Sequence, residues 1–131
     1  MKIRMQIDKQ NQWFTNISVV VDKRIAKTEF KIDTGCNCLL LSHITLQKLG
    51  LCASDIAKLP DAAATSVSER IPLKRVGKVS LYYGKNLIGT FDAHCHATRS
   101  TNDLLGSPIL QKFKQVHFDL TAESTMTLLS Q

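Results

Sequence analysis

The sequence has no long apolar run, although 44% of its 131 residues are hydrophobic. No window approaches the ~18 to 20 apolar residues that a membrane-spanning helix needs, so we expect no membrane segment in this chain. Residues 1–14 (MKIRMQIDKQNQWF) include basic side chains but lack the apolar core of a secretion signal. The expected location is therefore the cytoplasm or another reducing intracellular compartment.

Positive charge is in excess but is not gathered into one surface. The formal net charge is +6, which would suit an acidic partner. Basic residues cluster at 23–31 and again at 74–78, yet neither cluster is interleaved with the aromatic side chains that stack on bases. We interpret both clusters as solvated strand faces and expect no nucleic-acid partner. A nucleic-acid surface is the alternative.

The chain has only four cysteines, and without a secretion signal we expect reduced thiols. Cys36 and Cys38, together with the run His94, Cys95 and His96, raise the hypothesis of a zinc site. However, structural zinc sites usually space paired ligands by two to four residues. On a strand, His94 and His96 would also point to the face opposite Cys95. We therefore expect no metal and no other cofactor, with Cys36 and Cys38 as small buried side chains.

Short runs in which polar and apolar residues alternate predict a chain made mostly of β-strands. Residues 51–69 are weakly patterned, and the small, polar stretch 61–70 (DAAATSVSER) predicts an exposed hairpin or loop. The expected strands are 1–7, 13–21, 26–32, 71–84, 86–97, 115–120 and 125–129, with turns around 22–24 and 84–86.

Two short helices are predicted among these strands. Ser42 is a plausible N-cap before apolar residues at near-helical spacing, and Gly50 stands where that helix would end. Ser107 is expected to cap a second helix with Pro108 at its first position, where proline sacrifices no hydrogen bond. The length suits one domain. The pattern therefore predicts a single all-β domain over residues 1–131 with one or two short helices.

One acidic triplet, Asp-Thr-Gly at residues 33–35, follows Phe30 and Ile32 at the end of an expected buried strand. Alone it is weak evidence, since a turn aspartate often accepts hydrogen bonds from nearby backbone N–H groups. Its context strengthens it. An apolar run and a short helix follow the triplet, and the apolar-apolar-glycine motif 104–106 comes some seventy residues later.

With these motifs in place, the chain resembles the retropepsin-like (retroviral-type) aspartic proteases from about residue 3 to residue 129. The resemblance implies a closed or partly open β-barrel-like fold. It also implies an aspartic endopeptidase that hydrolyses peptide bonds in peptide or protein substrates. The matching pieces are FKIDTG (30–35), LLLSHITLQKLGL (39–51), DLLGSPILQKF (103–113) and VHFDL (116–120).

The resemblance also assigns roles to single residues. Asp33 would be the catalytic aspartate, and Thr34 would hydrogen-bond to the matching loop of a second subunit. Gly35 would permit a tight turn and close approach of the substrate backbone. A second apolar loop, packed beneath the Asp33 loop, would consist of Leu104, Leu105 and Gly106.

Substrate contacts are expected just after the triplet and in a flap. The segment 61–70 would be the flap that closes over a bound peptide, although it contains no glycine, whereas retroviral flaps are glycine-rich at the tip. Cys36 stands where the family usually has Ala or Ser, and it places a thiol beside the catalytic loop, which raises the question of redox sensitivity. The expected contacts are Cys36, Asn37, Ser66, Val67 and Ser68.

The chemistry implied by the resemblance needs two carboxylates. One group must take a proton from water while another gives one, and two carboxylates about 3 Å apart share a single proton and supply both functions. No other aspartate has a Thr-Gly neighbourhood, so the second group is expected from Asp33 of another copy in a homodimer. The terminal strands 1–7 and 125–129 would form its interface, because they would otherwise be exposed edges. The alternative is a catalytically silent retropepsin-like domain that dimerises or binds a peptide.

Overall fold

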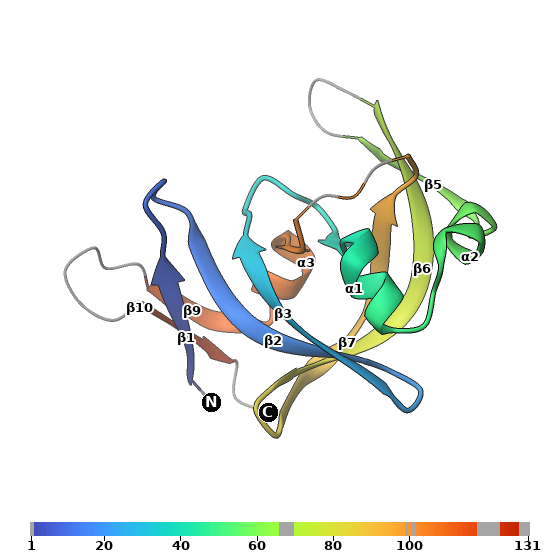
Figure 1. Ribbon diagram of the computed structural model, residues 1–131. Coiled ribbons are helices and arrows are strands. Elements are labelled where there is room, and N and C mark those ends of the chain that lie inside the picture. The colour runs from blue at the N-terminus through green and yellow to red at the C-terminus, as the bar shows by residue number, and fades with distance from the viewer. Residues whose placement is uncertain (1, 66–69, 99, 101, 118–123, 129–131) are drawn as a thin grey trace.

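The computed structural model describes residues 2–65, 70–98, 100, 102–117 and 124–128, and strands dominate them (Figure 1). This composition confirms the predicted all-β class. The three helices found there span four to six residues, and none is long and apolar enough to cross a membrane. The elements are β1 (Lys2–Ile7), β2 (Trp13–Val21), β3 (Arg24–Ile32), β4 (Leu39–Leu40), α1 (His43–Lys48), α2 (Ala53–Ala57), β5 (Asp61–Thr65), β6 (Arg70–Tyr83), β7 (Asn86–His96), β8 (Leu104–Leu105), α3 (Ser107–Leu110), β9 (Phe113–His117) and β10 (Ser124–Leu128).

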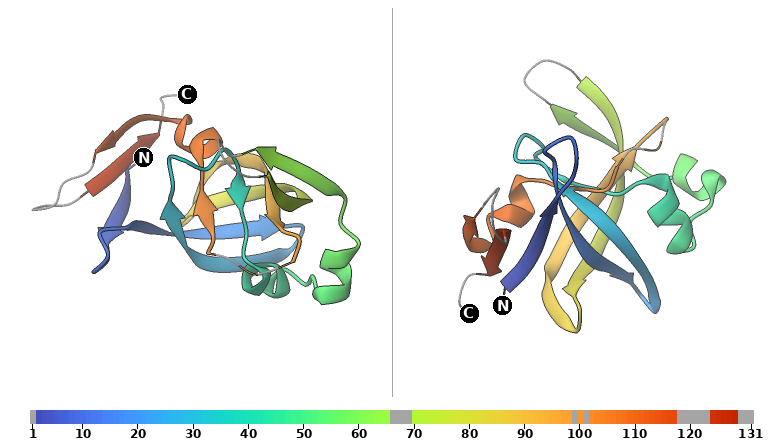
Figure 2. Two further views of the ribbon diagram at one scale, coloured as in Figure 1. Left: turned by 90° about the horizontal axis from the view of Figure 1, so that it is seen from above. Right: turned by 60° about the vertical axis from the view of Figure 1, so that its left-hand side comes forward.

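Six of these strands close into a barrel. Hydrogen-bonded neighbours follow the order β6-β7-β4-β8-β3-β2, and β2 pairs again with β6, which closes the ring. The closing contact is antiparallel and places Val19 opposite Leu81, both fully buried. Figures 1 and 2 show the long strands of this barrel crossing over one another, with the helices placed around it. The predicted barrel-like fold is therefore confirmed.

Two tight hairpins hold the long strands in register. β2 and β3 are joined by a two-residue turn in which Asp22 has a φ of 53°, and β6 and β7 by one in which Gly84 has a φ of 59°. Hairpin turns of two residues favour this left-handed conformation, which Gly and Asp adopt at lower cost than most residues. The turns predicted around 22–24 and 84–86 are confirmed.

The first helix matches its prediction and the other two differ from it. The Ser42 hydroxyl accepts a hydrogen bond from the N–H of Thr45, and Gly50 follows α1 with a φ of 90°. The short helix α2 was not predicted, because its five residues show no apolar periodicity. The predicted Ser107 cap is wrong. Gly106 is the N-cap of α3, and the N–H of Ser107 instead donates to the carbonyl of Cys36.

The terminal strands pair with each other inside the chain. β1 lies between β2 and β10, and β10 pairs in turn with β9. Figure 1 shows these strands beside the barrel, close to both ends of the chain. The reason given for their role, that they would otherwise be exposed edges, is therefore wrong, while a dimer interface formed by these strands stays a prediction. Among the strands that the structure describes, β9 and β5 are the two ends of the sheet order.

Candidate active site

The Asp33 loop, residues 33–38, is fixed at both ends to one short strand. β3 leads into the loop and β4 leaves it, and both pair with β8, which lies between them. The N–H of Asp33 donates to the carbonyl of Leu105 at 3.0 Å. Leu39 and Leu105 are buried in the core. The loop is therefore anchored to the interior of the barrel while its middle faces outward.

The Asp33 side chain is half-buried and turns back toward its own loop. Its Oδ1 accepts a hydrogen bond from the N–H of Gly35 at 3.0 Å. A purely structural turn aspartate makes the same contact. Across the described part of the chain, the carboxylate has no further hydrogen-bond partner and no basic side chain at ion-pair distance. One carboxylate oxygen is thus available to water or to another group.

Thr34 and Gly35 are both exposed. Within the described residues, the Thr34 hydroxyl has no hydrogen-bond partner. The backbone of Gly35 is not left-handed, and among the described residues a Cβ built there would meet only Asp33 Oδ1, at an ordinary 3.4 Å. Neither local conformation nor packing against the part of the chain that the structure describes therefore requires glycine at position 35.

Gly106 differs from Gly35, because the packing of the chain itself requires glycine at this position. A Cβ at Gly106 would overlap the backbone carbonyl oxygens of Cys36 and Cys38 and lie 2.9 Å from the backbone nitrogen of Cys38. The adjacent Ser107 N–H donates to the Cys36 carbonyl at 2.8 Å. The Leu-Leu-Gly segment thus packs directly against the Asp33 loop along its backbone.

Two thiols belong to the same loop. The sulfur atoms of Cys36 and Cys38 lie 3.6 Å apart, and both residues are half-buried, so the prediction that they are buried is wrong. A hydrogen bond from the Cys38 thiol lowers the pKa of Cys36 to about 7, against the opposing effects of burial and of the nearby Asp33 charge. The same hydrogen bond, with burial, raises the pKa of Cys38.

Asp103, which the sequence did not single out, ties the surrounding elements together. It is 7% exposed, and a buried carboxylate must be hydrogen-bonded to be tolerated. Its Oδ1 accepts from the N–H of Ser42 at 2.7 Å, and its Oδ2 accepts from the hydroxyls of Thr28 at 2.7 Å and Thr45 at 2.9 Å. Its backbone carbonyl accepts from the N–H of Lys31. One side chain thereby links β3, the start of α1 and the entry to β8.

Replacing Asp103 by Asn is expected to lower the free energy of unfolding by about 2 kcal/mol, because hydrogen bonds to a charged acceptor become bonds to a neutral amide. Urea unfolding at fixed protein concentration measures the loss. Asp61→Asn is the matched control, since the Asp61 side chain is 89% exposed and its ion pair with Lys74 lies on the surface. Equal stability of the two variants would contradict the structural role of Asp103.

The run His94, Cys95 and His96 lies at the end of β7. Cys95 is fully buried, and burial raises the pKa of its thiol. His96 is buried as well, whereas His94 is half-buried with its Nδ1 unpaired among the described atoms. In the described ranges, no group of three or more His, Cys, Asp or Glu side chains is arranged to hold a metal ion.

The hairpin predicted within residues 61–70 is present. β5 and β6 pair antiparallel from Asp61 opposite Lys74 to Thr65 opposite Arg70. In Figure 1 and in the right-hand view of Figure 2, this hairpin and the Asp33 loop lie at the same end of the barrel. The three expected flap contacts, Ser66, Val67 and Ser68, lie outside the described residues. Asn37 is exposed in the Asp33 loop.

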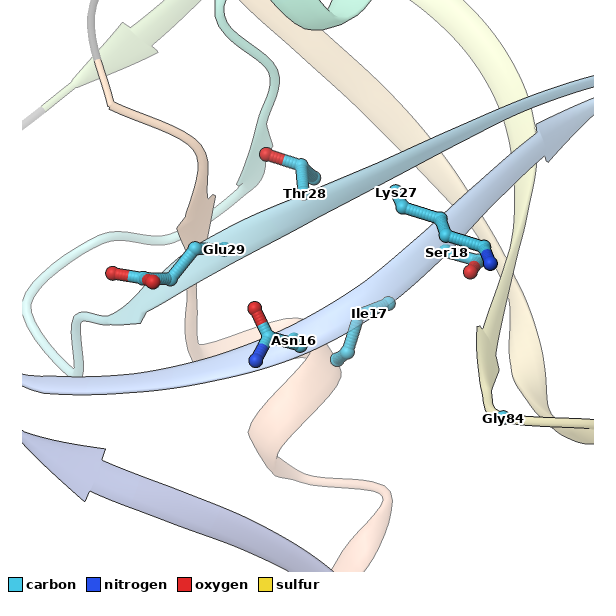
Figure 3. A pocket seen from close by; sticks show the side chains of 7 residues that line it. All are labelled: Asn16, Ile17, Ser18, Lys27, Thr28, Glu29 and Gly84. Atoms are coloured by element: carbon cyan, nitrogen blue, oxygen red, sulfur yellow. The ribbon is translucent and has the colours of Figure 1, made fainter.

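Two surface pockets lie away from the loop. The larger, of about 460 Å³, is formed by the neighbouring strands β2 and β3 with Gly84 from the turn after β6 (Figure 3). The other, of about 280 Å³, lies beside α1 and includes Asp103. Neither pocket is lined by Asp33 or the rest of its loop, so neither is a candidate for a catalytic cleft. The larger pocket is lined by Asn16, Ile17, Ser18, Lys27, Thr28, Glu29 and Gly84.

Comparison with known proteins identifies the fold. No protein-family model matches the sequence, and no curated protein matches it significantly. Among solved structures, a retropepsin-like aspartic protease from Rickettsia conorii superposes with a TM-score of 0.65 at 21% sequence identity, and the match covers 96% of this chain and 90% of that chain. This chain therefore has the retropepsin-like fold, and the resemblance read from its motifs is confirmed at the level of the fold.

Proposed function

We propose that this chain is an aspartic endopeptidase whose active site is assembled from two copies, each of which supplies one Asp33. The proposal rests mainly on the Asp-Thr-Gly triplet, which occupies an outward-facing loop on a retropepsin-like fold. The Asp33 carboxylate there keeps one oxygen free of partners within the described residues. A carboxylate in this state can exchange a proton with water, which hydrolysis requires.

The second carboxylate is proposed to come from a second copy, because no other aspartate has a Thr-Gly neighbourhood and Asp103, which lies in a matching motif, already accepts hydrogen bonds within the chain. Asp103 immediately precedes the Leu-Leu-Gly segment, but it is buried and accepts hydrogen bonds from Ser42, Thr28 and Thr45. Thr34 and Gly35 support the same conclusion. Both are exposed, and no contact within the described chain accounts for the free hydroxyl or for the missing side chain. A matching loop and a substrate backbone would account for both.

The mechanism follows from two Asp33 carboxylates that share one proton. The ionised carboxylate takes a proton from the water that attacks the peptide carbonyl, and the protonated one donates to the carbonyl oxygen. Breakdown of the tetrahedral intermediate then transfers a proton to the leaving amine. Each Asp33 thus acts once as base and once as acid, and neither copy can complete the cycle alone.

The proposed substrate is an extended peptide lying between the Asp33 loops and the β5–β6 hairpins. Extended peptides pair with exposed strand edges through their backbone groups, and β5 is one end of the described sheet order. Cys36 and Asn37, which follow the triplet on the accessible side of the loop, are the proposed contacts on the opposite side. A catalytically silent peptide-binding dimer is the second candidate, and the absence of glycine from residues 61–70 favours it.

Subunit mixing tests whether the active site needs two copies. A fixed amount of wild-type protein is mixed with Asp33→Asn protein, and cleavage of a mixed peptide library at mildly acidic pH is followed by mass spectrometry. Because mixed dimers contain one Asp33, an equal amount of the variant should reduce cleavage to about half, and a ninefold excess to about a tenth.

The matched control is addition of Asp22→Asn protein, which changes an exposed aspartate in the turn between β2 and β3. Its subunits retain Asp33 and should form active mixed dimers. Sedimentation shows whether subunits dimerise and exchange under the assay conditions. Cleavage that persists undiminished in mixed dimers would place both carboxylates within one chain. A dimer without turnover on any library peptide would favour the silent peptide-binding alternative.

A further inference from the structure

The Cys36 and Cys38 thiols, within the Asp33 loop, are placed to react with each other. Their sulfur atoms are 3.6 Å apart, and a disulfide bond of about 2 Å would require an approach of only ~1.5 Å. Both residues are half-buried, so a small reagent can reach them. We propose that this pair is an oxidation site, at which a hydroperoxide such as hydrogen peroxide converts the two thiols into a disulfide within the loop.

The other two cysteines lack this arrangement. Cys95 is fully buried in the core, and its raised pKa keeps it protonated. Cys52 is exposed, but its sulfur contacts the Ser54 hydroxyl and the Asp55 carboxylate rather than a second thiol. All four cysteines lie among the described residues, and Cys36–Cys38 is the one pair with adjacent sulfur atoms.

The pKa values of the two thiols shift in opposite directions, which assigns them different roles in the oxidation: Cys36 attacks the peroxide, and Cys38 then closes the disulfide. A hydrogen bond from the Cys38 side chain stabilises the Cys36 thiolate and lowers the pKa of Cys36 to about 7, so Cys36 ionises before Cys38. The thiolate is the form that attacks peroxides. Cys38, whose pKa is raised, retains its proton until Cys36 has been oxidised.

The reaction takes place in two steps. The Cys36 thiolate attacks one peroxide oxygen, the O–O bond breaks, and the products are Cys36 sulfenic acid and hydroxide, which is protonated to water. The Cys38 sulfur then attacks the Cys36 sulfur. An S–S bond forms, the S–O bond breaks, and the departing hydroxyl takes the Cys38 proton and leaves as water. In sum, two thiols lose two electrons and two protons, and one hydrogen peroxide becomes two waters.

Oxidation is expected to disturb Asp33 because residues 106 and 107 hold the backbone of the two cysteines in place, so the loop can yield only toward Asp33. The Cys36 carbonyl accepts from the N–H of Ser107 at 2.8 Å, and Gly106 packs against the backbone of both cysteines. The Cys36 N–H in turn donates to the carbonyl of Asp33 at 3.2 Å. When the sulfur atoms approach, the movement must therefore be taken up within residues 33–38. This consequence rests on the proposed peptidase function.

The direct test is mass spectrometry of the purified full chain after treatment with a small excess of hydrogen peroxide at pH 7. The peptide that contains both cysteines should become about 2 Da lighter, resist alkylation at both sulfurs, and return to its original mass with dithiothreitol. In Cys38→Ser, dimedone should instead trap Cys36 as a sulfenic acid. Cys52→Ser is the matched control and should still form the disulfide. If Cys36 and Cys38 can both still be fully alkylated after the peroxide treatment, the proposal is overturned.

Activity is a separate readout. If wild-type protein cleaves peptides, the disulfide should lower cleavage at least ~10-fold, since small displacements of reacting groups are costly, and dithiothreitol should restore it. A disulfide that forms without loss of cleavage would overturn the coupling to Asp33. A chain that never cleaves any peptide would instead contradict the proposed function, while the mass change would still decide the oxidation site.

Alkylation by iodoacetamide tests the role of Cys38 independently. The rate at Cys36 should rise with pH and reach half its maximum near pH 7, because the thiolate is the reactive form. In Cys38→Ala the donor is lost, while burial and the Asp33 charge still oppose ionisation, so the midpoint should move to higher pH. An unchanged midpoint would overturn the assignment of Cys38 as the hydrogen-bond donor.

Discussion

Replacing Asp33 by Asn is expected to reduce peptide cleavage by ~10²–10⁴-fold, the range typical for loss of general acid–base catalysis. Asn has nearly the same shape and keeps an oxygen that can accept the Gly35 N–H hydrogen bond at the position of Oδ1. The loop should therefore retain its fold, while the amide can neither take a proton from water nor share one with a second carboxylate. Initial rates on a mixed peptide library, compared at equal protein concentration, measure the effect.

Two measurements separate lost chemistry from lost structure in the Asp33→Asn variant. Its solution mass should equal that of the wild-type protein, because the proposal assigns Asp33 to proton transfer. Asp22→Asn, which changes an exposed aspartate in the turn between β2 and β3, should cleave at the wild-type rate. Undiminished cleavage by Asp33→Asn would contradict the assignment of Asp33, and reduced cleavage accompanied by a lower solution mass would show that the dimer had been disrupted.

The sequence predicted the elements that are determined by local pattern. Strand β2 has the predicted bounds, and its alternation places Thr15, Ile17 and Val19 on the buried side. Helix α1 follows from a capping serine and a terminal glycine, both of which act over a few residues. Helix α2 was missed because its five residues are too few to show a period, and because Cys52 is an unusual residue at an N-cap.

The sequence was less informative where the answer depends on segments that meet only after folding. The pairing of β1 with β10 joins the two ends of the chain, so no local pattern could have shown that these strands are not free edges. The role of Asp103 is a similar case, since its hydroxyl partners lie 75 and 58 residues away in the chain. A charged residue directly before an apolar pair was the available signal for a buried, hydrogen-bonded carboxylate.

The two loop glycines should respond differently to alanine, and this contrast separates folding from function. Gly106→Ala is expected to lower the free energy of unfolding by about 3 kcal/mol, because overpacking a tight contact costs this order of energy. The new Cβ would overlap backbone oxygens of Cys36 and Cys38, which cannot move aside as a flexible side chain would. Since those residues belong to the Asp33 loop, cleavage should fall together with stability.

Gly35→Ala is the matched variant in the other loop. Its Cβ would meet only Asp33 Oδ1, at 3.4 Å, among the residues that the structure describes, and the backbone there is not left-handed. Unfolding stability should therefore be unchanged, or higher by up to ~1 kcal/mol because alanine restricts the unfolded chain. Cleavage should nevertheless fall, because the proposed need for glycine comes from the close approach of a substrate or of a second loop.

Urea unfolding and peptide cleavage, measured on both variants at one protein concentration, give the four values that decide between these roles. If Gly106→Ala is as stable as the wild type, the packing of the Leu-Leu-Gly segment against the Asp33 loop is not as tight as its geometry indicates. If Gly35→Ala cleaves at the wild-type rate, no substrate or partner backbone approaches that position closely. The described part of the chain constrains Gly106 but not Gly35. Loss of cleavage without loss of stability in Gly35→Ala would therefore show that the Asp33 loop works against a surface that the described residues of one chain do not supply.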